Sequence, residues 1–335
     1  MGLVACSGGS STSPPPPAPN TSTSPARVTD AITGSALSGV TATGTQISGS
    51  ASSLSGVMTV GATSASASAR AVTFSRDGYV SRTVAMKIPG SEVAVTMIPS
   101  TFNLTAFDEL LRVTLLQRWT AAPPLRVQTR TLQFTGVNQA DAVAIDDAMS
   151  GDERVSLEED LTWALPQLTG NSFTSFAGIT RETIEVDGLM QVLNTGMITV
   201  ARYAGLTEGT RQVCGGSGCL GYSRWQFRTD GTVIGGTIML DRDFDRSGHS
   251  ARRSLRAHEL GHALGYTHVT VLQSAMNSNA LTEPNTFDKQ ATLIAFLRPP
   301  GNVRPDSDPA EASLNRLGAA IWSRGEGFRA LTGWR

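Results

Sequence analysis

The chain has 335 residues, a formal net charge of −1 at pH 7 and only 16% charged side chains. This balance argues against nucleic acid or an anionic membrane surface as a partner. Apolar residues make up 40% of the chain, which is enough for sizeable cores, and the length predicts two domains. Aromatic residues are few, whereas Gly, Ser, Thr and Ala are plentiful, as in β-rich exported proteins. No stretch reaches the roughly 20 apolar residues of a membrane-spanning helix.

Residues 1–25 are predicted to form a disordered tether rich in Ser, Thr and Pro. The segment LVAC, which ends at Cys6, resembles a bacterial lipobox. The resemblance implies lipidation of Cys6 and a membrane tether at the bacterial cell surface or outer membrane, with secretion as the alternative. Only five residues precede Cys6, so the charged and apolar regions of a signal peptide are missing. Either Met1 is not the natural start, or the match is a coincidence.

Residues 26–99 are predicted to form a small all-β sandwich. Val84, Met86 and Ile88 alternate with less apolar neighbours, and turn signals such as Asp77-Gly78 separate the segments. The stretches VTDAITGSALSGVTATG and VTFSRDGYVSRTVAMKIPG resemble carboxypeptidase regulatory-like modules. That resemblance implies a transthyretin-like fold and a role as a spacer or recognition unit.

Residues 100–300 are predicted to form a second domain, followed by a tail or weak helix over residues 301–335. Apolar spacing predicts helices, and short β-rich runs predict strands. A capping-box pattern, Ser156 with Glu159, predicts the start of one helix. The predicted helices cover residues 101–122, 156–170, 254–266 and 286–298, and the predicted strands cover residues 125–134, 180–186, 197–205 and 232–241.

Two further features between residues 214 and 248 could carry chemistry. Cys214 and Cys219 bracket a glycine-rich loop that permits a disulfide, which we favour over a free pair or a second metal site. Downstream, Asp241, Asp243 and Asp245 alternate with arginine or phenylalanine. Alternating acids could bind Ca²⁺, but a solvated acidic loop explains them better.

Three of the four histidines fall within HELGHALGYTH. His258 and His262 are four residues apart, so they share one helix face and can bind one metal ion. Gly265 can stop the helix and turn the chain, which allows His268 to supply a third ligand from another direction. Three neutral imidazoles leave one Zn²⁺ position for an acidified water. Glu259 can then act as the general base.

The pattern H-E-x-x-H-x-x-G-x-x-H resembles the metzincin clan of zinc metalloproteases. The resemblance implies an α+β fold, in which a twisted mixed sheet and an active-site helix follow the sandwich. It also implies that Met276 forms a hydrophobic floor beneath the zinc and that residues 232–241 are an edge strand for extended substrate. No tyrosine follows Met276, which argues against the astacin-like and serralysin-like sites that use one as a ligand.

Two functions are compatible with these patterns. The first is a zinc-dependent endopeptidase that acts on a protein or peptide substrate, with Glu259 as general base. The second is a cell-surface binding lipoprotein for polysaccharide or protein, with a non-catalytic metzincin-like domain. Glu259 favours the first, because a zinc scaffold alone needs no general base. The sequence leaves the preferred peptide, any latency mechanism, the calcium requirement and the oligomeric state open.

Overall fold

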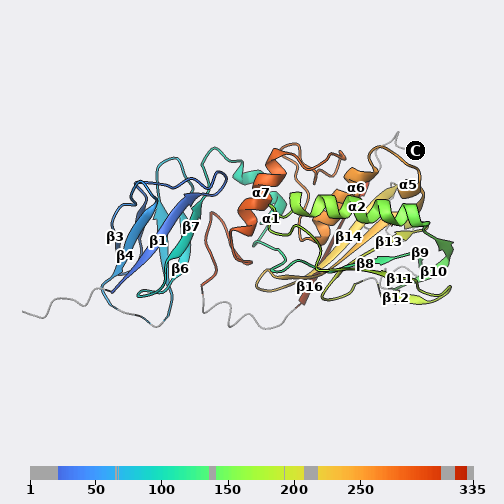
Figure 1. The fold of residues 1–335 in the computed structure, drawn as a ribbon, viewed down its shortest axis with the longest axis horizontal. Coiled ribbons are helices and arrows are strands. Elements are labelled where there is room, and N and C mark those ends of the chain that lie inside the picture. Colours follow the sequence, from blue (N-terminus) through green and yellow to red (C-terminus); the bar gives the residue numbers. More distant parts are fainter. Residues whose placement is uncertain are drawn as a thin grey trace, which may run out of the picture.

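The computed structural model describes residues 22–64, 66, 68–135, 141–191, 193–206, 218–310 and 321–329. Within these ranges the chain is a mixed α/β protein, in which two small sheets and one large sheet account for the named strands (Figure 1). No helix in the described ranges is both long and apolar enough to cross a membrane.

The two small sheets face each other across their own core. One has the order β3-β4-β1-β7 and the other β2-β5-β6. Alternate side chains point inwards, so Val28, Phe74, Val84, Met86 and Ile88 are buried together. The strands are β1 (Ser22–Asp30), β2 (Thr41–Thr43), β3 (Ile47–Gly49), β4 (Val57–Ala62), β5 (Arg70–Ser75), β6 (Arg82–Met86) and β7 (Val93–Met97).

The large sheet has nine strands among the described residues, and its main path runs β12-β10-β9-β13-β15-β14-β16. Strand β8 pairs with β11 and β13. The strands are β8 (Leu125–Gln128), β9 (Arg130–Phe134), β10 (Asp141–Ala148), β11 (Ile179–Glu182), β12 (Leu189–Gln191), β13 (Ile198–Tyr203), β14 (Cys219–Arg228), β15 (Val233–Asp241) and β16 (Ile321–Arg329).

Helices cover one face of this sheet (Figure 1). Helix α6 packs against β14 and β15 and against α2, so it lies between the sheet and the longest helix. Buried side chains such as Leu161, Ile238 and Leu260 fill the space between these layers. The helices are α1 (Leu104–Leu111), α2 (Gly151–Gln167), α5 (Arg242–Arg246), α6 (Arg252–Ala263) and α7 (Thr286–Phe296).

A buried cluster of charges joins the small sheets to the rest of the chain. Arg82 of β6 lies 2.9 Å from Asp306 and 2.9 Å from Asp308, and Arg298 lies 2.7 Å from Asp306. Arg298 also donates to the carbonyl of Thr96 in β7. Burial alone would raise the pKa of Asp306, but the surrounding guanidinium groups, Arg298 first, hold it below its ordinary value. The carboxylate therefore stays ionised between the two parts of the molecule.

Two helices differ from the sequence prediction. Helix α2 begins at Gly151 and is capped by Ser150, not by Ser156, because Ser150 and Glu153 form the capping box: the Ser150 amide donates to Glu153 at 2.7 Å. Helix α1 ends at Leu111, far short of residue 122. Arg112 leaves the helical conformation because its buried guanidinium binds the segment around Asn302.

The strands also differ from the prediction, and the single strand expected over residues 125–134 is two, β8 and β9. Strand β15 is not an edge strand, since it pairs in parallel with β13 and antiparallel with β14. Its residues are almost all buried, as expected for a central strand covered on both faces. Residues 321–329 are neither a tail nor a helix, because they form β16 and pair antiparallel with β14.

Candidate metal centre

Helix α6 carries the first two histidines of the motif on one buried face. His258 and His262 are both 0% exposed, and Leu255, Leu260 and Ala263 pack beside them into the core. The spacing of four residues places the two imidazoles one turn apart, edge to face, with ring centroids 4.7 Å from each other. The rigid helix therefore fixes two candidate ligands before any ion binds.

Gly265 ends the helix and turns the chain back. Its φ is +107°, in the region that favours glycine, and an added Cβ would lie 2.8 Å from the side chain of Val233. The Gly265 amide donates to the His262 carbonyl and the Tyr266 amide donates to the Gly261 carbonyl, which is the Schellman pattern. This turn brings His268 to the other two histidines.

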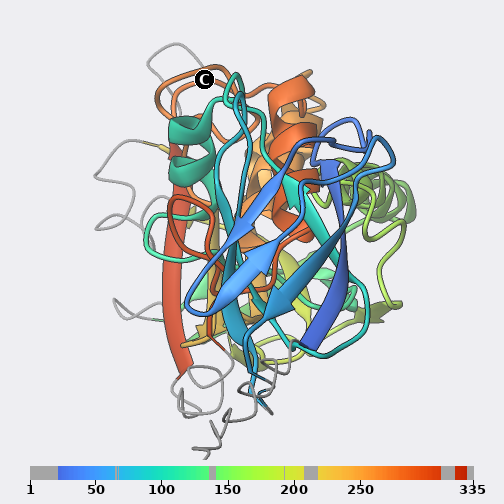
Figure 2. The same cartoon turned by 90° about the vertical axis from the view of Figure 1, so that its left-hand side faces the viewer.

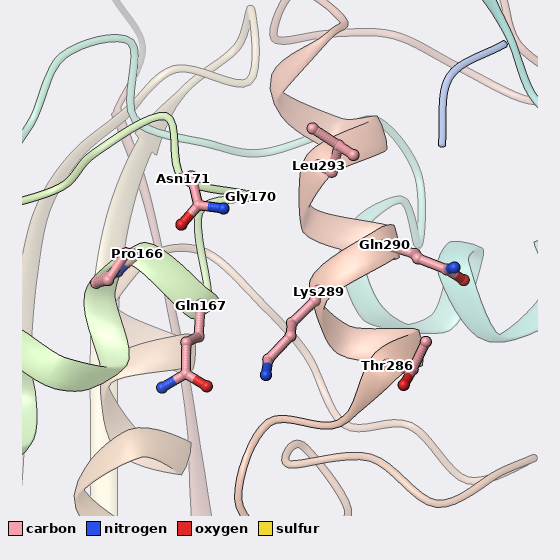
Figure 3. Close-up of a pocket in the computed structure, with 8 residues that line it drawn as sticks. All are labelled: Pro166, Gln167, Gly170, Asn171, Thr286, Lys289, Gln290 and Leu293. Carbon is pink, nitrogen blue, oxygen red and sulfur yellow. The ribbon is translucent and has the colours of Figure 1, made fainter. Parts of the chain in front are cut away.

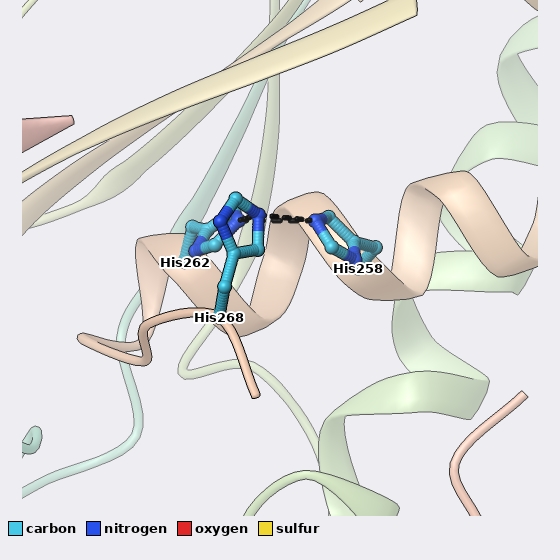
Figure 4. A group of neighbouring side chains, drawn as sticks. All are labelled: His258, His262 and His268. Carbon is cyan, nitrogen blue, oxygen red and sulfur yellow. Dashed lines mark hydrogen bonds between the residues drawn. The ribbon is translucent and has the colours of Figure 1, made fainter. Parts of the chain in front are cut away.

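The three imidazoles point their Nε2 atoms at one place (Figure 4). The Nε2 atoms are 3.0 Å apart for His258 and His262, 3.2 Å apart for His262 and His268, and 3.3 Å apart for His258 and His268. A search of the described His, Cys, Asp and Glu side chains for groups that could hold a metal ion gives these three histidines.

The hydrogen bonds of the Nδ1 atoms determine the tautomer of each histidine, and so whether its Nε2 atom presents a lone pair. His258 Nδ1 lies 2.7 Å from the Ala275 carbonyl and His262 Nδ1 lies 2.8 Å from the Tyr266 carbonyl. A carbonyl only accepts, so both Nδ1 atoms carry the proton and both Nε2 atoms present lone pairs. His268 Nδ1 lies 3.2 Å from the carboxylate of Glu326, which favours the same tautomer. Lone pairs this close repel each other unless a cation lies between them.

The donor set fits a metal ion. Burial lowers the pKa of His258 to about 3 and holds that of His262 well below 6.5, so both rings are neutral, as ligands must be. Bonds of about 2.0–2.1 Å to a tetrahedral ion place ligand nitrogens about 3.3 Å apart. The observed separations of 3.0–3.3 Å are close to this value.

Glu259 lies beside the histidines and is itself 0% exposed. The Ser223 hydroxyl of β14 donates to its Oε2 at 2.8 Å, whereas Oε1 has no hydrogen-bond partner among the described residues. Burial raises the pKa of Glu259 to about 8, although the Ser223 hydroxyl and the Phe328 amide act in the opposite direction. An added Cβ on Gly221 would lie 2.4 Å from Oε1, so this glycine makes room for the carboxylate.

Met276 packs directly under the helix. It is fully buried, and its Sδ lies 2.4 Å from where a Cβ on Gly261 would be. Gly261 stands between the two helical histidines, so the thioether occupies the space that a side chain there would need. The Met276 carbonyl accepts from the Val269 amide, which ties this turn to the residue after His268.

Several site residues were missed by sequence reasoning. Asp288 of α7 accepts from the Ala275 amide at 2.9 Å and thereby fixes the carbonyl that binds His258. Trp225 of β14 lies parallel to the His262 ring, at 3° and with centroids 6.1 Å apart. The spacing of Gly221, Ser223 and Trp225 is a period-two signal for one face of a strand. The sequence around Glu326 carries no pattern that indicates a role in the site, because Glu326 reaches His268 only through the pairing of β16 with β14.

The remaining candidate residues lie apart from this centre. The acidic stretch does not converge on a calcium site: Asp241 caps α5, Asp243 pairs with Arg242, and Asp245 is buried against arginines. Cys219 is disulfide-bonded, and its expected partner Cys214 lies outside the described residues, as does Cys6.

A hollow lies between the end of α2 and the face of α7 (Figure 3). Gln167, Asn171 and Lys289 line it, and none of the three clustered histidines does. It holds no group of acids, histidines or cysteines suited to metal binding or catalysis, so we assign it no chemistry.

Comparison with protein-family models gave no match, and a search of curated proteins found no matching relative.

Proposed function

We propose that the chain is a zinc-dependent endopeptidase of the metzincin type. The observation that carries the proposal is the meeting of three Nε2 lone pairs within 3.0–3.3 Å of one another. Such an arrangement is unfavourable without a cation and well suited to one. The intact motif with Glu259 beside the ligands favours a catalytic site over a purely structural one.

Zinc is the metal that suits this donor set best. Three neutral imidazoles with no fourth protein ligand are typical of catalytic zinc sites, whereas Ca²⁺ and Mg²⁺ prefer oxygen ligands. His258, His262 and His268 would hold the ion. A bound zinc ion supplies a Lewis acid that polarises a carbonyl and lowers the pKa of water to about 7.

Glu259 supplies the proton transfer that peptide hydrolysis needs. Its unpartnered Oε1 can accept a proton from the attacking water and then deliver it to the departing amine. The Ser223 hydroxyl holds the other oxygen at 2.8 Å and fixes the orientation of the carboxylate. Burial raises the pKa of this carboxyl above its ordinary value, so its ionised form is a stronger base than an exposed carboxylate.

An extended peptide is the substrate class that the surroundings favour. Strand β14 runs beside α6, and its outer edge pairs antiparallel with another extended segment, β16. An edge of this kind binds peptides through main-chain hydrogen bonds. The position of Met276 beneath α6 and the mixed sheet support the metzincin-like fold that the motif implies.

The other parts of the chain complete the proposal. The N-terminal sandwich would act as a transthyretin-like spacer or recognition unit, and lipidation of Cys6 would tether an exported enzyme to the cell surface. The competing function is a surface lipoprotein that binds polysaccharide or protein without cleaving it. Tight glycan binding by a chain that cleaves neither casein nor glycoproteins would favour that alternative.

A single comparison tests the proposed activity. Purified protein should hold one zinc per chain and cleave denatured casein. Glu259→Ala should retain the zinc but lose activity by about 10²–10⁴-fold, because a general base contributes that much. Thr292→Ala, on α7, is the control and should leave activity unchanged. Absence of stoichiometric zinc, or full proteolysis by Glu259→Ala, would overturn the proposal.

A further inference from the structure

The metal centre is covered by a segment of the chain itself. Strand β16 runs along the outer edge of the large sheet (red in Figure 2), and its residues pair antiparallel with β14 from Ile321↔Arg228 to Arg329↔Cys219. Strand β14 is the strand that carries Ser223, which binds Glu259. The edge next to the catalytic glutamate is therefore already occupied.

Alternate residues of β16 reach into the site. Glu326 Oε2 accepts from the His268 amide at 3.1 Å and lies 3.2 Å from His268 Nδ1. Two residues on, the Phe328 ring is 1% exposed and meets the His258 ring edge to face, with centroids 5.5 Å apart. Residues i and i+2 of a strand share one face, so β16 directs both side chains at the histidines.

This cover has a consequence for access. His258, Glu259 and His262 are each 0% exposed, and Phe328 of β16 covers His258, so the parent chain should cleave casein only through the small fraction of molecules in which β16 has left the edge. A peptide that bound along β14 would need the same main-chain groups that β16 uses. The segment and an extended substrate are therefore mutually exclusive.

The two ends of β16 differ in burial, so the strand can separate from β14 starting at its exposed end. Ile321 and Trp322, at its beginning, are 53% and 57% exposed, whereas Phe328 is buried. Gly325 allows close approach to β14, because a Cβ there would lie 2.1 Å from the Tyr222 hydroxyl. Tyr222 is only 4% exposed and cannot easily move aside. Besides the main-chain pairing and Glu326, the contact thus depends on a glycine and on one buried aromatic anchor.

We propose that residues 321–329 are a built-in competitor that occupies the peptide-binding edge of β14 and keeps the metal centre latent. The proposal rests on the proposed peptidase function. Displacement of β16 would free the main chain of β14 and expose Glu259 to an extended peptide in the same antiparallel orientation. The segment is thus a pseudo-substrate held in cis.

The test uses the full chain and one substitution outside the catalytic residues. Gly325→Val should push β16 from Tyr222 and raise casein cleavage by about tenfold or more, since overpacking of this kind shifts an equilibrium by that factor. Phe328→Ala, which removes the buried anchor, should act in the same direction. Trp322→Ala, on the same strand but exposed, is the matched control and should leave activity unchanged.

Two further measurements separate regulation from catalysis. Zinc release to a chelator should be faster in Gly325→Val than in the parent chain, and this readout does not depend on proteolysis. A synthetic peptide of residues 321–329 should inhibit Gly325→Val competitively, whereas the same peptide carrying valine at position 325 should not. Unchanged cleavage and unchanged zinc release in both β16 variants would overturn the latency proposal and leave the peptidase intact. Faster zinc release without cleavage in any variant would instead overturn the peptidase function.

Discussion

The contact between Gly261 and Met276 allows the packing under the metal centre to be tested quantitatively. An alanine methyl at Gly261 would lie 2.4 Å from Met276 Sδ and 3.0 Å from its Cε, both too close. Alanine improves helix propensity by about 1 kcal/mol, whereas overpacking of a core costs about 1–3 kcal/mol. Gly261→Ala should therefore lower the free energy of unfolding by up to about 2 kcal/mol.

The double variant distinguishes this contact from a general weakness of the helix. Met276→Ala alone leaves a cavity and should cost about 2–5 kcal/mol. With both substitutions, the new methyl occupies part of the vacated space. The combined loss should therefore be smaller than the sum of the two losses by about 1–2 kcal/mol.

Urea unfolding, followed by tryptophan fluorescence in excess chelator, measures these energies without a contribution from bound metal. Gly151→Ala is the control, because a Cβ there meets nothing within 4 Å, and it should be neutral or slightly stabilising. Additive losses for Gly261→Ala and Met276→Ala, within about 0.5 kcal/mol, would show that the thioether does not fill this space.

Three further substitutions test Asp288, which supports the site, and two charged residues away from it, Glu153 and Asp306. Asp288→Ala should weaken zinc binding by about 10–100-fold in a competition assay with a chelating dye, because it frees the carbonyl that orients His258; unchanged affinity would contradict this. Burial raises the pKa of Glu153, but the hydrogen bond from the Ser150 amide and the charge of Arg202 outweigh it and lower the pKa from 4.5 to about 2. The stability that ionised Glu153 contributes is present above pH 4.5 and is lost as the pH falls towards 2. Glu153→Gln should therefore lower the free energy of unfolding by about 1–3 kcal/mol at pH 7 and by little at pH 2, as measured by urea titration. An equal loss at both pH values would refute the lowered pKa of Glu153. Asp306→Ala leaves buried guanidinium groups uncompensated and should cost about 3–5 kcal/mol, and a loss below about 1 kcal/mol would show that the cluster contributes little.

The sequence predicted the parts of the site that depend on neighbouring residues. The four-residue spacing of His258 and His262 places them on one helix face, and Gly265 supplies the turn that returns His268, so local geometry alone brings the three together. The start of α2 was mistaken because two similar capping patterns lie six residues apart. The pattern at Ser150 begins the helix directly after β10. The position of β10 decides between the two patterns, and the local sequence does not show that position.

Strand order was not predictable in the same way. The apolar run of β15 was taken for an edge strand by resemblance, yet an almost continuously buried run is the mark of a central strand. Strand β16 was missed because the residues that cover the histidines come from a segment about sixty residues away in the sequence, and their own composition carries little period-two signal. Pairing across such distances depends on which edge is free, and a single sequence does not reveal that.

The register of strand pairing connects the local helix motif with the strand order of the sheet. Ser223 of β14 pairs with Ile238 of β15, and this register directs Gly221 and Ser223 towards Glu259. A slip of one residue would turn Tyr222 and Arg224 to that face, since successive side chains alternate. Their bulk could not fit where an added Cβ at Gly221 already lies 2.4 Å from the carboxylate. The helix motif therefore supplies the candidate metal ligands, whereas the pairing of β14 decides whether Glu259 can lie beside them and which extended segment can cover it.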